Sequence, residues 1–139
     1  MTAKEFPRTI LVVDDESTIT SSLVMVLNRF RYEFSAFGAT SFDQARAMVS
    51  NIRPELVLLD VHMPGVEGLE GAIELQNKFG LKVVLISGSP DTAELLDKAK
   101  QQHGMSFPIL AKPIPPIELV DSIRKLVASD SFVSRSTSI

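Results

Sequence analysis

The stretch LVLLDVHMPGVEG, residues 56–68, does most to decide which fold this chain adopts. A short aliphatic run leads directly into Asp60, and Pro64-Gly65 marks a turn a few residues later. Short aliphatic runs that are bounded by turns are typical of strands buried on both faces of a sheet. The stretch therefore predicts a central strand that ends in a carboxylate.

Three other apolar runs end in the same way. ILVV leads into Asp14 and Asp15, VVLI leads into Ser87, and FPILA leads into Lys112 and Pro113. Because the carboxyl ends of parallel strands form one edge, where ligands bind in the crevice of an open α/β sheet, we expect these groups to converge on one pocket. Carboxylates, a hydroxyl and an ammonium group together suit a divalent metal and a phosphoryl group.

Strand-like runs alternate with helical patterns along the chain. The predicted strands are 9–13, 32–37, 56–59, 83–86 and 107–111, and the second is placed at an edge because it is the least hydrophobic. The apolar stripe of the first helix includes Leu23, Leu27 and Phe30, and the third helix spans about 67–79. This order predicts an α/β fold, (βα) repeated five times, with helices on both faces of a parallel sheet.

Capping residues predict where these helices begin and end. Ser17 is the predicted N-cap of the first helix, and Thr40 or Ser41 that of the second. The third helix should end at Gly80, and Gly71 inside it should cost about 1 kcal/mol relative to alanine. The fourth should run from near Asp91 to Gly104, and the fifth should begin at Pro115-Pro116.

Composition excludes several classes of protein. The chain has 139 residues, a net charge of -3 and no cysteine, which fits one domain without disulfides or thiolate sites and gives no sign of a polyanion partner. The longest aliphatic stretch, 23–27, is far too short for a membrane helix, and MTAKEFPRT has no apolar segment of the signal-peptide type. We expect a soluble cytoplasmic protein with a flexible, Ser-rich tail at 129–139.

The acidic groups each allow two interpretations. Adjacent carboxylates repel, so Asp14 and Asp15 persist best beside a cation, whereas a solvated turn before a helix is the simpler alternative. Asp60 can act as a covalent nucleophile on phosphorus, or it can be an ordinary N-cap or turn residue. Together, the three acids favour a magnesium site, because Mg²⁺ prefers oxygen ligands.

The other two groups are individually weaker signals. Ser87 can donate to a phosphoryl oxygen, and Gly88 leaves room for close approach of a ligand to the backbone, although Ser-Gly-Ser-Pro is also a common loop composition. Lys112 is a familiar type of phosphate ligand, although most lysines are merely exposed. The bond to Pro113 is a candidate for the cis form.

In combination, VVDDE at 12–16, LVLLDVHMPGVEG at 56–68, VVLISG at 83–88 and AKP at 111–113 resemble the receiver domain of bacterial two-component response regulators. The resemblance covers residues 8–128. It implies the flavodoxin-like fold of the CheY-like superfamily, with strand order 2-1-3-4-5. It implies that Asp60 accepts a phosphoryl group, and that Mg²⁺ is bound by Asp15, Asp60 and the His62 backbone carbonyl, and mainly through water by Asp14.

The resemblance also assigns the remaining positions. Lys112 and the Ser87-Gly88 segment would contact the phosphoryl group, and Ser87 would swing toward it as a switch. His62 and Ser89 would tune the lifetime of the aspartyl phosphate, with a His62 ring that simply faces solvent as the alternative. Receivers usually carry Tyr or Phe where this chain has Ile109, so the aromatic switch is missing, unless nearby Phe107 replaces it.

The implied partners are a histidine kinase or phosphotransfer protein and a downstream protein target, with no direct contact to nucleic acid or membrane. The chain is expected not to be an enzyme beyond its own Mg²⁺-dependent phosphorylation and dephosphorylation.

The alternatives are a phosphorelay intermediate, a degenerate receiver used for docking, a fragment that lacks its output module, and self-association through the fourth and fifth helices. A magnesium-dependent phosphohydrolase is disfavoured because His62 stands where a general-acid aspartate is needed, and a flavin-binding or purely structural domain because Asp14-Asp15-Glu16 would repel a phosphate.

Overall fold

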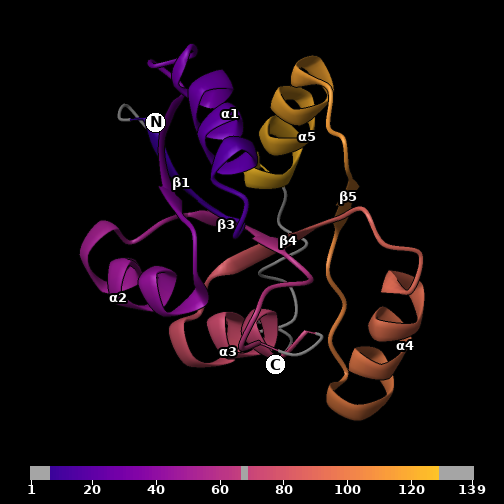
Figure 1. The fold of residues 1–139 in the computed structure, drawn as a ribbon. Coiled ribbons are helices and arrows are strands. Elements are labelled where there is room, and N and C mark those ends of the chain that lie inside the picture. The colour runs from indigo at the N-terminus through magenta and orange to yellow at the C-terminus, as the bar shows by residue number, and fades with distance from the viewer. Residues whose placement is uncertain (1–6, 67–68, 129–139) are drawn as a thin grey trace.

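The computed structural model describes residues 7–66 and 69–128, in which strands and helices alternate as the sequence predicts (Figure 1). The elements are β1 (Arg8–Val13), α1 (Ser17–Asn28), β2 (Phe34–Ala39), α2 (Phe42–Ile52), β3 (Leu56–Asp60), α3 (Glu70–Phe79), β4 (Lys82–Ser87), α4 (Thr92–His103), β5 (Ile109–Ala111) and α5 (Pro116–Ala128). The strands are parallel and pair in the order β2-β1-β3-β4-β5. The predicted doubly wound α/β fold and its strand order are confirmed.

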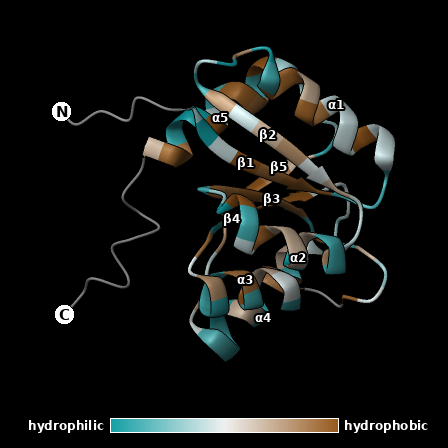
Figure 2. Ribbon diagram, turned by 90° about the vertical axis from the view of Figure 1, so that its left-hand side faces the viewer, coloured by the Kyte–Doolittle hydropathy of each residue, from teal (hydrophilic) through white to brown (hydrophobic). Residues whose placement is uncertain are grey.

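Two layers of helices cover the sheet, with α1 and α5 on one face and α2, α3 and α4 on the other (Figure 2). Successive residues of β1, β3 and β4 contribute alternately to the two apolar clusters, which is why these strands are almost continuously aliphatic. β2 lies at an edge, as predicted, but it begins two residues later than expected because Tyr32 is 84% exposed in the preceding turn.

Most helix ends follow the predicted caps, but the start of α1 does not. Ser41 caps α2, since its side chain accepts a hydrogen bond from the Gln44 amide, and Gly80 and Gly104 end α3 and α4 with positive φ. The prediction of Ser17 as N-cap is wrong, because Glu16 occupies that position and makes no side-chain cap bond. The Glu16 amide instead donates to the Asp14 carboxylate, which turns the chain tightly out of β1.

Two apolar positions also depart from the predicted pattern. Phe30 is 39% exposed, because α1 ends at Asn28 and the stripe ends with it. Gly71 in α3 is a site of close packing rather than a simple weak point, since a Cβ there would lie 2.8 Å from Cε1 of Phe42.

α3 itself begins at Glu70, whereas its predicted start at 67 and the predicted tail at 129–139 lie outside the described residues. None of the described helices is both long and apolar enough to span a bilayer.

Candidate functional site

The register of the sheet brings the predicted site residues to one edge. Asp60 is level with Ile86 in the β3–β4 pair, so Ser87 lies one residue beyond it. Ser87 is level with Ala111 in the β4–β5 pair, and Lys112 follows directly. Asp14 occupies the corresponding position after β1, whose last residue pairs with Leu59. The convergence expected from the sequence therefore follows from parallel pairing at the carboxyl ends of four strands.

Three carboxylates form the centre of the site. Asp14 is fully buried, Asp60 is 7% exposed and Asp15 is exposed, and each offers an oxygen that lies within 4.8 Å of the others. Thr20 of α1 fixes the first acid by donating a hydrogen bond from Oγ1 to the Asp14 carbonyl, at 2.7 Å. The site is thus acidic, and a side chain of α1 holds the backbone of Asp14.

Lys112 supplies the positive charge of the pocket. Its Nζ lies 2.7 Å from Oδ2 of Asp14 and 3.5 Å from Oδ1 of Asp60, and its amide donates to the Ser87 carbonyl at 2.8 Å. Burial alone would lower the pKa of Lys112, but the nearby carboxylates of Asp14 and Asp60 outweigh it and raise the pKa. The peptide bond between Lys112 and Pro113, which the sequence marked as a candidate, is cis.

The positive charge of Lys112 alone does not neutralise the three acids of the site. Burial and the charge of Asp14 raise the pKa of Asp60, although Lys112 acts in the opposite direction. Among the described residues, Oδ2 of Asp14 is buried without an aligned hydrogen-bond donor, despite the ammonium group close by. A buried, under-satisfied carboxylate oxygen within a set of three acids fits Mg²⁺, which prefers oxygen ligands. The carbonyl of His62 as a further ligand stays a prediction.

The Ser87 hydroxyl is held in a buried hydrogen-bonded group. Ser87 is 5% exposed, and its Oγ accepts from the Ser89 amide at 3.0 Å and lies 2.5 Å from Oγ1 of Thr92. Oγ1 of Thr92 also donates to the Ser89 carbonyl, at 3.0 Å. Sequence reasoning missed Thr92, because a threonine at the start of an amphipathic helix gives no signal of a bond to the preceding strand. A Cβ on Gly88 would lie 3.5 Å from Cβ of Lys112, an ordinary contact, so its protein neighbours do not require a glycine there.

His62, Ser89 and Asp91 form a second hydrogen-bonded group, which connects the β3–α3 and β4–α4 loops. Nε2 of His62 lies 2.9 Å from Oδ1 of Asp91, and the Ser89 hydroxyl donates to the same oxygen at 2.5 Å. The hydroxyl of Ser89 and the His62 ring together lower the pKa of Asp91. The His62 side chain is 45% exposed, but its ring is held at the surface by the contact to Asp91. The backbone amide of His62 also donates to Oδ1 of Asp60, at 3.3 Å.

Ile109, which stands where receivers usually carry Tyr or Phe, lies in the edge strand β5. Ile109 is 40% exposed in β5, while its neighbour Leu110 is buried in the cluster beneath α1 and α5. Phe107 is 6% exposed and belongs to the cluster on the opposite face, with residues of α4. The aromatic ring nearest to Ile109 along the chain is therefore part of the core.

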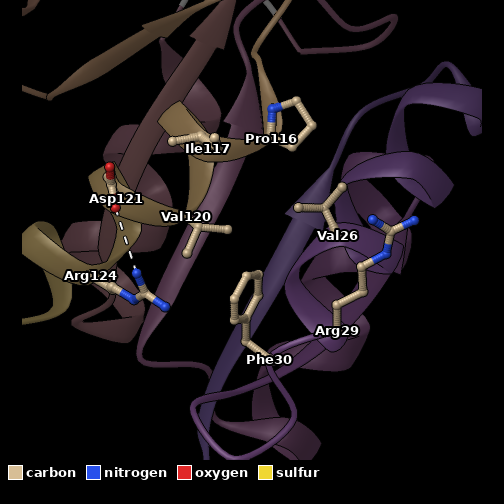
Figure 3. Close-up of a pocket in the computed structure, with 8 residues that line it drawn as sticks. All are labelled: Val26, Arg29, Phe30, Pro116, Ile117, Val120, Asp121 and Arg124. Atoms are coloured by element: carbon tan, nitrogen blue, oxygen red, sulfur yellow. Dashed lines mark ion pairs between the residues drawn. The ribbon is translucent and has the colours of Figure 1, made fainter.

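Two surface cavities lie along α1. One, of about 470 Å³, is bordered by Thr18 and Ile19 on one side and by Lys112 and Pro113 on the other, so it adjoins the acidic pocket. The second, of about 260 Å³, is an apolar groove in which Val26 and Phe30 face residues of α5 such as Val120 (Figure 3). The sequence-predicted site residues do not line this second groove.

Comparison with known proteins identifies the family of this chain. Residues 10–124 match the family model of the response regulator receiver domain, and the chain belongs to this family. It is 32% identical over 118 residues to the DNA-binding response regulator MtrA of Mycolicibacterium smegmatis, covering 83% of this chain and 48% of the relative. It is 29% identical over 135 residues to the transcriptional regulatory protein PdtaR of Mycobacterium tuberculosis, covering 92% and 64%. The chain thus spans about half the length of the MtrA relative.

Solved structures show the same fold. The receiver domain of NtrX from Brucella abortus is 28% identical with a TM-score of 0.72, and the match covers 86% of this chain and 98% of that one. A CheY-like receiver domain protein from Methanospirillum hungatei is 23% identical with a TM-score of 0.73, covering 93% and 98%. Membership of the receiver family and the observed strand order both agree with the resemblance read from the sequence.

Proposed function

We propose that this chain is a phosphorylation-controlled signalling module in which Asp60 accepts a phosphoryl group. The observation that carries the proposal is the position of the Asp60 carboxylate, which lies at a strand end beside two further acids and 3.5 Å from the Lys112 ammonium group. A nucleophilic oxygen is thereby placed next to a cation and to a set of metal ligands, which is what transfer of a phosphoryl group requires.

In the proposed reaction, a carboxylate oxygen of Asp60 attacks the phosphorus of a phosphohistidine. The new P–O bond forms as the P–N bond breaks, and the bonding electron pair stays on the histidine nitrogen. Lys112 holds its charge near the incoming phosphoryl oxygens, since its ammonium group already lies between Asp14 and Asp60. Magnesium held by Asp14, Asp15 and Asp60 would offset the negative charge of the phosphoryl group. The His62 amide keeps the nucleophile oriented through its bond to Oδ1 of Asp60.

The proposed donors are a histidine kinase or a phosphotransfer protein, and the proposed target is a downstream protein in the cytoplasm. The chemistry is confined to the protein's own phosphorylation and dephosphorylation. In support, His62 stands where an aspartyl phosphohydrolase needs a general-acid aspartate, and its ring is bonded to Asp91 at the mouth of the pocket. Sustained turnover of a phosphate ester would contradict this part of the proposal.

Intact-protein mass spectrometry after incubation with acetyl phosphate tests the proposal. We expect one phosphoryl adduct in the presence of Mg²⁺, little adduct in EDTA, and none in Asp60→Asn. Asp97→Asn provides the matched control, because Asp97 is an exposed acid on α4 away from the pocket. An adduct that survives in Asp60→Asn would show that the nucleophile is misassigned, and no adduct in any condition would refute the proposal.

A further inference from the structure

Counting protons shows which of the two buried hydroxyls, Ser87 or Thr92, donates to the other. A hydroxyl donates one hydrogen bond only, whereas a backbone carbonyl can only accept. Oγ1 of Thr92 donates to the Ser89 carbonyl, and Oγ of Ser87 accepts from the Ser89 amide. The 2.5 Å contact between the two hydroxyls is then satisfied only if Ser87 is the donor and Thr92 the acceptor. The single proton of Ser87 is therefore committed to Thr92.

This commitment conflicts with the role of Ser87 in the proposed function. To donate to a phosphoryl oxygen on Asp60, Ser87 must first withdraw its proton from Thr92. Thr92 is 5% exposed and is the first residue of α4, so its hydroxyl has little access to water as a replacement donor. A change at Ser87 therefore reaches α4 directly, through the contact between the Ser87 and Thr92 hydroxyls.

We propose that Thr92 is a positioning residue that competes with the phosphoryl group for the proton of Ser87 and so holds the unphosphorylated conformation. The inference rests on the proposed function, and it extends it by naming the contact that links the pocket to α4. It also gives the chain a route that does not need an aromatic residue at position 109, where Ile109 is 40% exposed. When Ser87 turns to the phosphoryl group, the amino end of α4 loses its side-chain hydrogen bond to β4.

Binding of beryllofluoride, a stable phosphoryl mimic, tests the inference by calorimetry in the presence of Mg²⁺. Thr92→Val removes the hydroxyl while keeping a β-branched side chain of similar shape. We expect it to bind the mimic roughly two- to tenfold more tightly than the wild type, as loss of one competing hydrogen bond would cause. Thr92→Ser keeps the hydroxyl and should restore affinity close to that of the wild type. A purely structural role for Thr92 would weaken binding, which is the opposite sign.

A double-mutant cycle isolates the contact. In a Ser87→Ala background, Thr92→Val should leave the affinity for the mimic unchanged, because no proton remains to compete for. Urea unfolding of the same four proteins without metal or mimic should show a favourable coupling between Ser87 and Thr92. Unchanged or weaker binding by Thr92→Val, in a protein whose wild type binds the mimic, would overturn the role of Thr92 alone. A wild type that binds no mimic would overturn the proposed function and this inference together.

Discussion

At the scale of single residues, the surroundings of Asp60 oppose the charged form of its carboxyl group. Burial and the charge of Asp14 raise its pKa, so the folded protein binds this proton more tightly than the unfolded chain does. Below the ordinary pKa of aspartate, Asp60 is protonated in both the folded and the unfolded protein, so its ionisation does not change the free energy of unfolding there. As pH rises through the ordinary pKa and then through the raised pKa of the folded state, the folded protein loses stability.

The first prediction follows for Asp60→Asn, which removes the ionisable group and keeps the shape. In EDTA at about pH 7 the variant should unfold at a higher urea concentration than the wild type, and the difference should shrink as pH approaches about 4. Urea unfolding at several pH values measures it, with Asp97→Asn as the exposed control. Lower stability of Asp60→Asn at neutral pH would mean that attraction to Lys112 outweighs burial and Asp14.

At the scale of elements, two serines that look alike in the sequence differ in the structure. Ser41 caps α2 by accepting from the Gln44 amide, whereas Ser17 lies inside the first turn of α1 behind Glu16. Ser41→Ala should therefore lower the free energy of unfolding by about 1 kcal/mol. Ser17→Ala should change it by no more than about 0.5 kcal/mol, as surface substitutions usually do. Chemical denaturation of both variants measures the contrast, and equal losses would contradict the cap assignment.

Gly71 in α3 gives a second prediction at this scale, because two effects oppose each other. Alanine should favour the helix by about 1 kcal/mol over glycine. Its Cβ, however, would lie 2.8 Å from Cε1 of Phe42 and 3.2 Å from Cγ1 of Val66, and such overpacking typically costs about 1–3 kcal/mol. We expect Gly71→Ala to destabilise the protein by about 1 kcal/mol in thermal or urea unfolding. In a Phe42→Leu background the added methyl group should be tolerated better, and a stabilising effect in the wild-type background would refute the packing argument.

These elements also show how far the sequence alone could predict the structure. Strands such as 56–59 were predictable because an aliphatic run bounded by a turn is too short for a typical helix and too apolar for a loop. The site acids and Lys112 were predictable as a group because parallel pairing places strand ends at one edge. Ser17 was misassigned because a hydrogen bond from the Glu16 amide to Asp14 sets the start of α1, and local pattern does not record it. Asp91 was missed because its bond to His62 depends on how two loops meet in space. Thr92 was missed because a threonine at the start of a helix gives no signal of a bond back to the preceding strand.

At the scale of the whole molecule, binding of Mg²⁺ by the three acids should be coupled to folding. A ligand that binds only the folded protein stabilises it by about 1.4 kcal/mol at a tenfold excess over its dissociation constant. We expect Mg²⁺ to raise the melting temperature, and Asp15→Asn to remove most of this rise, since Asp15 is exposed and its loss leaves the core intact. Thermal melts with a Mg²⁺ titration measure the effect. Asp97→Asn is the control, and an undiminished rise in Asp15→Asn would exclude this residue as a ligand.

The last residue of α1 affects how this molecule meets its neighbours in a crowded solution. Asn28 places its side-chain amide against the edge strand β2, accepting from the Ala36 amide at 2.8 Å and donating to the Ala36 carbonyl at 3.1 Å. Backbone groups on an edge strand are a template on which another chain can add a strand. By occupying both groups of Ala36, Asn28 obstructs sheet extension and the aggregation that can follow from it. Contact between copies of this protein along this part of β2 is thereby disfavoured.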